Sequence, residues 1–345
     1  MDTVGILLRA GAEGRDVGSV ADDFDRVEVP AAMAYALGLD PDQDTAGQPA
    51  ALPDGRLVVL AGPGVVGTRS VDGLRAFATA ANVPVANTWG AKGVLPWDSP
   101  HHMGTCGLQA RDFELLDFAS YDAIVATGTD LAESPEQRFG LAPIVDIPPT
   151  ALGRLAEGVT PAGEPIPSNE LYTRLSAVAQ PGYADDRIPL HPARAVADVR
   201  AAFQAGGVVV GDPGVAGLWV ARTYPTTEPG TIVVPAIATP GIAAALALVA
   251  ALRGLPTVAV TSEPLDPATH GVLELATELG AALAIDVWGP GGAVRRAEDH
   301  LEHLNIAARE PGVTIVDVPV DVSLTRKLVD AAGPVVAWGG LPQSA

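Results

Sequence analysis

The sequence predicts an α/β protein built from two doubly wound domains, each with a parallel sheet. Short apolar runs such as 57–61 and 257–260 show no alternation with polar residues, which is typical of strands buried on both faces. Segments in which apolar residues recur at helical spacing separate these runs. A proline-bearing stretch at 158–188 divides the chain into two halves with the same strand–helix rhythm, and this favours two domains.

Composition narrows the classes of function. The 345 residues carry a formal net charge of −20, which disfavours binding to nucleic acid or to an anionic membrane surface. The single cysteine, Cys106, excludes an internal disulfide. The most apolar run, 242–252, is shorter than the ~20 residues that a membrane-spanning helix needs. We therefore expect a cytoplasmic protein with no membrane partner.

The first half divides into a leader and one domain. Residues 1–54 are expected to form a loosely packed N-terminal leader, not an independent domain, with one helix at 30–39. Residues 55–157 form the first predicted domain. Its predicted strands lie at 57–61, 83–86, 123–126 and 144–147, and its first helix contains 74–78.

The second half begins after the predicted linker, 158–188, which has a short helix at 171–178. Residues 189–345 form the second predicted domain. Its predicted helices lie at 192–203, 241–252, 272–279, 293–308 and 324–332, and its strands at 208–210, 232–235, 257–260, 284–287 and 313–318.

A glycine-rich turn follows the first strand. Gly62, Gly64 and Gly67 fit the pattern G-x-G-x-x-G between a strand and a helix, where backbone amides can hold a phosphate of FAD, NAD or ADP. The same glycines also suit a tight turn that binds nothing. We favour the tight turn because the second strand runs into 87–89, which has no acidic residue for a ribose.

The first domain contains three motifs in order: P-V-x-x-T-x-x-x-K-G, then glycines spaced G-x-x-G, then D-x-x-x-x-x-G-T. Their residues are Pro84, Val85, Thr88, Lys92, Gly93, Pro96, Gly104, Gly107, Asp122, Gly128 and Thr129. With these motifs the domain resembles the central domain of the thiamine-diphosphate-dependent enzymes, of the acetolactate synthase and benzoylformate decarboxylase type. The resemblance implies a Rossmann-like fold.

The second domain resembles the diphosphate-binding domain of the same family, with Asp212 and Gly214 after its first strand. The resemblance implies thiamine diphosphate and Mg²⁺, held by Gly-Asp-Gly after a later strand and by an Asn further on. Here that strand runs into Glu263 and Pro264, and 286–290 contains no Asn. The motif is degraded, so we predict no metal ligands and no catalytic residues. The candidate cofactor-binding residues are Gly62, Gly64, Gly67, Asp212, Gly214 and Glu263.

These departures leave several functions open. The family's pyrimidine-binding domain, with its activating glutamate, has no counterpart in 1–54, so we expect the chain to have lost autonomous cofactor binding and catalysis. It would then act as a structural, regulatory or partner-binding protein, as a homo-oligomer or with a protein partner. One alternative is a subunit of a split thiamine-diphosphate-dependent carboligase or 2-oxo acid decarboxylase. A second is nucleotide binding by the first domain alone.

Three groups of polar residues have both a functional and a plain interpretation. His101, His102 and Cys106 are too few for a zinc site and are expected to be structural. His300 and His303 are expected on a solvated, acidic helix face. The third group could form an acid–base site, but a solvated loop is favoured. It consists of Glu263, Asp266 and His270.

Overall fold

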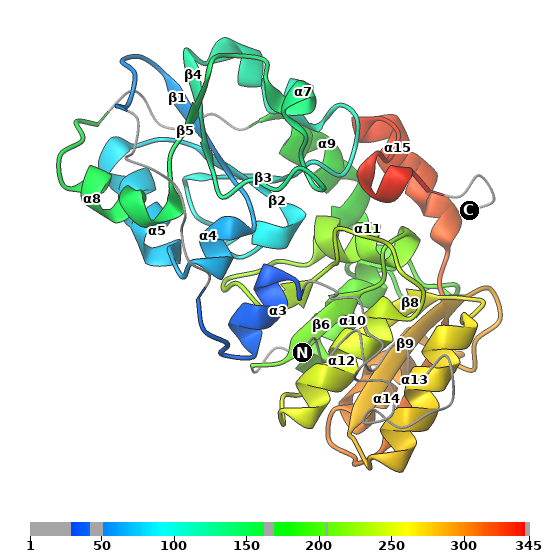
Figure 1. Ribbon diagram of the computed structural model, residues 1–345. Helices are drawn as coiled ribbons and strands as arrows, with labels where there is room; N and C mark the ends of the chain where they lie inside the picture. Colours follow the sequence, from blue (N-terminus) through cyan, green and yellow to red (C-terminus); the bar gives the residue numbers. More distant parts are fainter. Residues whose placement is uncertain (1–28, 42–50, 162–168, 204–205, 342–345) are drawn as a thin grey trace.

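The computed structural model describes residues 29–41, 51–161, 169–203 and 206–341. It contains two five-stranded sheets in which every pair of neighbouring strands is parallel. Helices pack on both faces of each sheet (Figure 1). The predicted fold class, two doubly wound parallel-sheet domains, is confirmed.

The sheet of the first domain has the strand order β3-β2-β1-β4-β5. On one face, α5 packs with α8 over a core that includes Leu74 and Phe77. The chain leaves β1 and β4 in opposite directions across the sheet, so a switch point lies between these two strands. The elements are β1 (Leu57–Ala61), α4 (Gly64–Gly67), α5 (Val71–Ala81), β2 (Val85–Thr88), β3 (His102–Cys106), α6 (Asp112–Leu115), β4 (Ala123–Thr127), α7 (Glu136–Phe139), β5 (Ile144–Asp146) and α8 (Leu152–Ala156).

Strand β3 was not among the predicted strands. It occupies the edge of the sheet and pairs only with β2. Its five residues include Gly104, at φ 123°, and only one β-branched residue, so they give no apolar run. An edge position tolerates such a sequence but does not require it, because β5 at the opposite edge was predicted from its apolar residues.

The sheet of the second domain has the strand order β10-β9-β8-β6-β7, with its switch point between β6 and β8. Helices α12 and α13 pack together on one face, while α10, α11 and α14 cover the other. The elements are α10 (Pro192–Phe203), β6 (Val208–Gly211), α11 (Val215–Thr223), β7 (Ile232–Val233), α12 (Ile242–Leu252), β8 (Thr257–Ser262), α13 (Pro267–Glu278), β9 (Leu283–Gly289), α14 (Ala297–Ala307) and β10 (Val313–Pro319).

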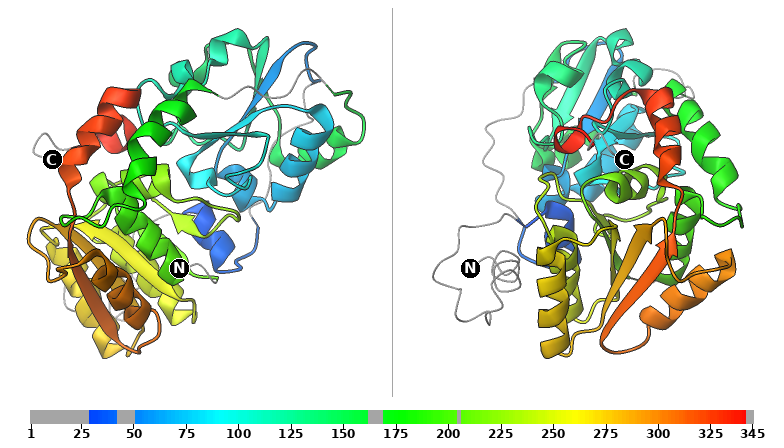
Figure 2. Two further views of the ribbon diagram at one scale, coloured as in Figure 1. Left: turned by 180° about the vertical axis from the view of Figure 1, so that it is seen from behind. Right: turned by 90° about the vertical axis from the view of Figure 1, so that its right-hand side faces the viewer.

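Two helices that come from later in the chain pack on the second face of the first sheet beside α6 and α7, whose Phe113 and Phe139 lie in the same core. Helix α9 (Glu170–Ala179) packs along α15 (Thr325–Ala332), as both views of Figure 2 agree. Leu171 and Ala332 from these helices join the core beneath the first sheet. The segment predicted as a linker therefore contributes, through α9, to the packing between the two domains.

Helix α3 (Ala31–Ala36) also lies at the domain boundary, against α4 and β7. Met33 is fully buried in the core beside α12. The expectation of loose packing is wrong for this helix, because its small and apolar residues fill the space between the domains. Residues 1–28 and 42–50 of the predicted leader lie outside the described residues.

No helix in the described part of the chain has the length and apolar character that crossing a bilayer requires.

Candidate functional site

The carboxyl ends of the strands in the second sheet carry the acidic residues singled out from the sequence. In doubly wound folds ligands bind at this edge, near the switch point. Asp212 follows β6 and Glu263 follows β8, so both lie at this edge. They do not share one cavity, because Glu263 lines a hollow whose lining does not include Asp212.

Asp212 is a half-buried carboxylate held by the neighbouring strand. Its Oδ2 accepts a hydrogen bond from the hydroxyl of Thr261 at 2.9 Å. Burial raises the pKa of Asp212 to about 6, the Thr261 hydrogen bond opposes this, and Asp266 adds to the rise. Gly214, at φ 137°, lets the chain turn into α11 with nothing within 4 Å of the position of a side chain. The space beside Gly214 can therefore admit a small ligand group, but the Asp212 carboxylate makes this space acidic.

Glu263 lies at the end of β8 over the end of β9. A side chain at Gly289 would collide with the Glu263 carboxylate, so the carboxylate occupies the space above that glycine. The Glu263 amide donates to the carbonyl of Trp288 at 2.9 Å, and Pro264 has no N–H. The backbone at this point therefore offers no free donor to a ligand.

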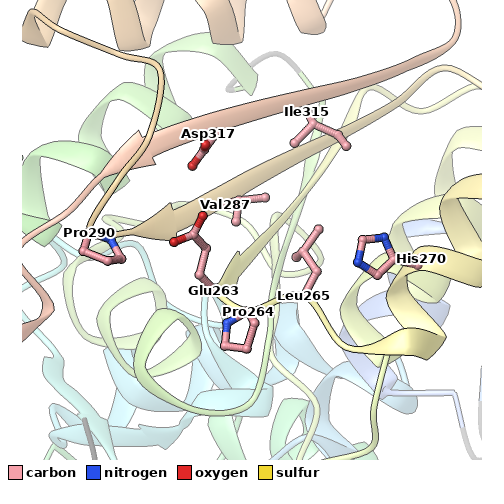
Figure 3. Close-up of a pocket in the computed structure, with 8 residues that line it drawn as sticks. All are labelled: Glu263, Pro264, Leu265, His270, Val287, Pro290, Ile315 and Asp317. Carbon is pink, nitrogen blue, oxygen red and sulfur yellow. The ribbon is translucent and has the colours of Figure 1, made fainter.

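An open hollow of about 610 Å³ lies beside Glu263. Figure 3 shows the carboxylates of Glu263 and Asp317 pointing toward each other, with His270 at the far side beyond Leu265. Asp317 Oδ1 is buried and has no hydrogen-bond partner among the described residues. Ile315 on the floor of the hollow is 51% exposed, so this is a shallow surface.

Asp266 does not belong to this hollow. Its carboxylate caps α13, accepting from the amide of Thr269 at 2.9 Å and from the amide of Gly241 at 3.2 Å. Capping by Asp satisfies amides that the first turn of a helix leaves free. The proposed acid–base group is thus separated into a helix cap, Asp266, and two residues that line the hollow, Glu263 and His270.

In the segment where the resemblance places an Asn, Asp286 and Trp288 point to the face of the sheet opposite Val287, which lines the hollow. Asp286 is fully buried, and its two oxygens accept from the indole of Trp288 at 2.9 Å and face His300 at 3.2 Å. The other ring nitrogen of His300 faces Asp198 at 3.0 Å. The prediction that His300 is solvated is wrong, because the face of α14 that carries it packs against α10 and the sheet.

This network keeps His300 charged. Burial alone lowers the pKa of His300, but Asp286 and Asp198 together outweigh burial and raise it to about 9. His303, one turn away, is exposed as predicted. The network braces α14 against the sheet and lies away from the carboxyl edge.

The glycine turn of the first domain is closed by close packing. A side chain at Gly62 or Gly64 would collide with Gly128 at the end of β4. The amides of Gly62, Gly64 and Gly67 all donate to carbonyls within the turn or to β4. This packing accounts for the glycines, and nucleotide binding at Gly62, Gly64 and Gly67 stays a prediction.

No cluster of three or more residues with metal-binding side chains occurs within the described ranges. His101 faces the carbonyl of Val83, and His102 faces Asn87 and the carbonyl of Trp97. Cys106 is buried. The contacts of His101 and Cys106 are those of structural residues, while His102 also lines a cavity at the domain boundary.

Sequence reasoning missed a second cavity, of about 770 Å³, at the domain boundary. Lys92 lines it and is 7% exposed. The sequence did single out Lys92, because it is one of only two lysines in the chain and lies in the motif P-V-x-x-T-x-x-x-K-G. The sequence does not show whether such a lysine is buried, so only the fold reveals that Lys92 lines a cavity.

Comparisons with known proteins agree with the geometry of the first domain. Residues 54–157 match the family model described as the central domain of thiamine pyrophosphate enzymes. The predicted resemblance to the thiamine-diphosphate enzyme family is confirmed over this part of the chain. A search of curated proteins found no match.

A solved structure shares the fold over more of the chain. It is the X-ray structure of a candidate thiamin diphosphate-dependent enzyme isolated from Mycobacterium smegmatis, with a TM-score of 0.58 and 16% sequence identity. The alignment covers 77% of this chain and 61% of that chain. At this identity the likeness establishes the fold alone.

Proposed function

We propose that this chain is a thiamine-diphosphate-enzyme-like protein whose second domain does not itself hold the diphosphate and Mg²⁺, and that it acts as a structural, regulatory or partner-binding protein. The similarity of 54–157 to the family's central domain supports the relationship. The geometry at the ends of β8 and β9 supports the loss of cofactor binding.

The residues there do not fit the cofactor. A diphosphate binds through backbone N–H groups and small residues that let the backbone approach it. At this edge the Glu263 amide is already bonded, Pro264 has no N–H, and the Glu263 carboxylate covers Gly289. A carboxylate in place of those donors repels the phosphates. The observation that carries this proposal is the backbone at 263–264, where the Glu263 amide is bonded to Trp288 and Pro264 has no N–H.

Association with another chain is the second part of the proposal. Leu252 and Leu279, at the ends of the packed helices α12 and α13, are 45% and 48% exposed, and Ile237 is 70% exposed. Exposed large apolar residues on one domain are what a protein interface would cover. We expect self-association or a protein partner.

Isothermal titration calorimetry with Mg²⁺ and thiamine diphosphate tests the first part. We expect no saturable heat with the full chain at millimolar cofactor, and the same result for Glu263→Gln, because charge removal leaves the side chain over Gly289. Sedimentation velocity on the same samples should show a species larger than the 35.1 kDa monomer.

Saturable, Mg²⁺-dependent binding by the chain alone would overturn the proposal. Binding that requires a second protein would favour the split-enzyme alternative instead. A monomer at every concentration, with no partner recovered, would refute the association part.

A further inference from the structure

The cavity at the domain boundary has the features of a ligand site. It lies between the edge strand β3, helix α9 and the end of α11, which Figure 1 places where the two domains meet. Its volume, about 770 Å³, is in the range of small-molecule sites. Apolar side chains form much of the lining, including Met103, Leu171 and Leu175.

Lys92 brings a buried ammonium group to this cavity without a counterion. Its only described hydrogen bond is to the hydroxyl of Thr105, at the long distance of 3.5 Å. No carboxylate among the described residues forms an ion pair with Lys92. Asp112 forms its ion pair with Arg222 instead. Burial, and secondly the charge of Arg222, lower the pKa of Lys92 to about 7. A buried cation left this way is costly to the fold.

A second polar group in the same lining also lacks a partner. Tyr224, at the end of α11, is 2% exposed, and its hydroxyl has no hydrogen-bond partner among the described residues. Buried polar atoms in folded proteins are nearly always hydrogen-bonded, so this hydroxyl needs an acceptor from within the cavity, which a water or a ligand can supply. Lys92 and Tyr224 are both hydrogen-bond donors, and donors of this kind fit an anion.

We propose that this cavity binds a small organic acid, with its carboxylate on the Lys92 ammonium and its apolar body against Met103, Leu171 and Leu175. A carboxylate supplies the charge and the acceptor oxygens that the cavity lacks. This proposal concerns the cavity at the domain boundary, and it does not depend on whether the second domain binds thiamine diphosphate.

Calorimetry with the full chain at pH 6, where Lys92 is protonated and hexanoate is ionised, tests the charge requirement. Hexanoate is the probe, and hexanamide is its uncharged counterpart of nearly equal shape. We expect hexanoate to bind at least tenfold more tightly than hexanamide. Lys92→Met should weaken hexanoate binding at least tenfold. Lys327→Met, the same substitution at the exposed second lysine, should leave it unchanged.

Chemical labelling places the probe without any variant. The chain has only two lysines, so dinitrofluorobenzene labelling read by peptide mass spectrometry reports on Lys92 and Lys327 together. Saturating hexanoate should slow labelling of Lys92 at least fivefold and leave Lys327 unaffected. This result stands even where Lys92→Met fails to fold.

Four results would overturn the proposal. They are equal affinity for hexanoate and hexanamide, hexanoate binding that survives Lys92→Met in a folded variant, labelling of Lys92 that hexanoate does not slow, and an absence of hexanoate binding to the unmodified chain.

Discussion

Arg222 and Lys92 are two buried cations at the same domain boundary, and the protein holds them in opposite ways. Arg222 donates to both oxygens of Asp112, at 2.6 and 2.8 Å, to the side chain of Gln109 at 3.1 Å and to the carbonyl of Thr105 at 2.7 Å. Lys92 contacts the hydroxyl of the same Thr105 at 3.5 Å. Arg222 thus has a counterion and hydrogen bonds from all three of its nitrogens, whereas Lys92 has one long contact.

The difference distinguishes a residue that holds the two domains together, Arg222, from a residue that is free to bind a ligand, Lys92. Arg222, on α11 of the second domain, ties itself to Asp112 on α6 of the first, so its charge is compensated and its geometry is fixed. A compensated charge of this kind positions two domains and is unavailable to a ligand. Lys92 faces a cavity, and its one long contact with Thr105 leaves most of its hydrogen-bonding capacity unused. An uncompensated charge costs stability, and a ligand can recover that loss.

The largest expected effect is the removal of Arg222. Arg222→Met leaves the Asp112 carboxylate buried without its partner, so we expect the free energy of unfolding to fall by about 3–5 kcal/mol. Urea denaturation measures this. The control is Arg111→Met, which breaks an exposed ion pair with Glu114 and should cost less than about 1 kcal/mol. Equal losses in the two variants would contradict the scaffold role of Arg222.

The next effect concerns a histidine held, like Arg222, by carboxylates. Because Asp286 and Asp198 raise the pKa of His300 to about 9 in the folded state, its contribution is fully present below the unfolded pKa of about 6.5. That contribution, about 2–3 kcal/mol, is lost as pH rises through 9. The difference in unfolding free energy between the wild type and His300→Gln should shrink over pH 6.5–10, while exposed His303→Gln shows no such trend. A difference that stays constant with pH would exclude the charged network.

The smallest effect has the opposite sign and comes from Lys92. Its folded pKa, about 7, lies below the ordinary value, so the unfolded chain binds more protons between pH 7 and about 10.5. Stability should therefore rise with pH over that window. Lys92→Met removes the penalty, and we expect it to stabilise the protein by about 1–2 kcal/mol at pH 7 in urea denaturation. A destabilised Lys92→Met variant would mean that Lys92 has a partner in the folded protein.

Much of the fold could be predicted from the sequence because the central strands are continuous apolar runs. β1 and β8 are buried over nearly their whole length, and α10 begins and ends where its proline and apolar spacing place it. β3 could not be predicted in this way, since its residues, His-Met-Gly-Thr-Cys, form no apolar run, whereas the other edge strands β5, β7 and β10 do contain one. The candidate site residues were likewise predictable only in part.

Asp212 and Glu263 lie at the sheet edge that the sequence indicated, but the residues that contact them are determined by packing.

The sequence by itself determined two parallel-sheet domains and the kinship of the first one, because periodic burial and glycine turns are local patterns along the chain. Only the tertiary structure decided which charges are paired. Arg222 and Asp112 are 110 residues apart, and His300 is 102 residues from Asp198. No local pattern links such residues, because the folding of both sheets brings them together. In the sequence Lys92 does not differ from any other lysine of the motif. It becomes a candidate binding residue only in the folded protein, where α9 and α11 line a cavity beside it.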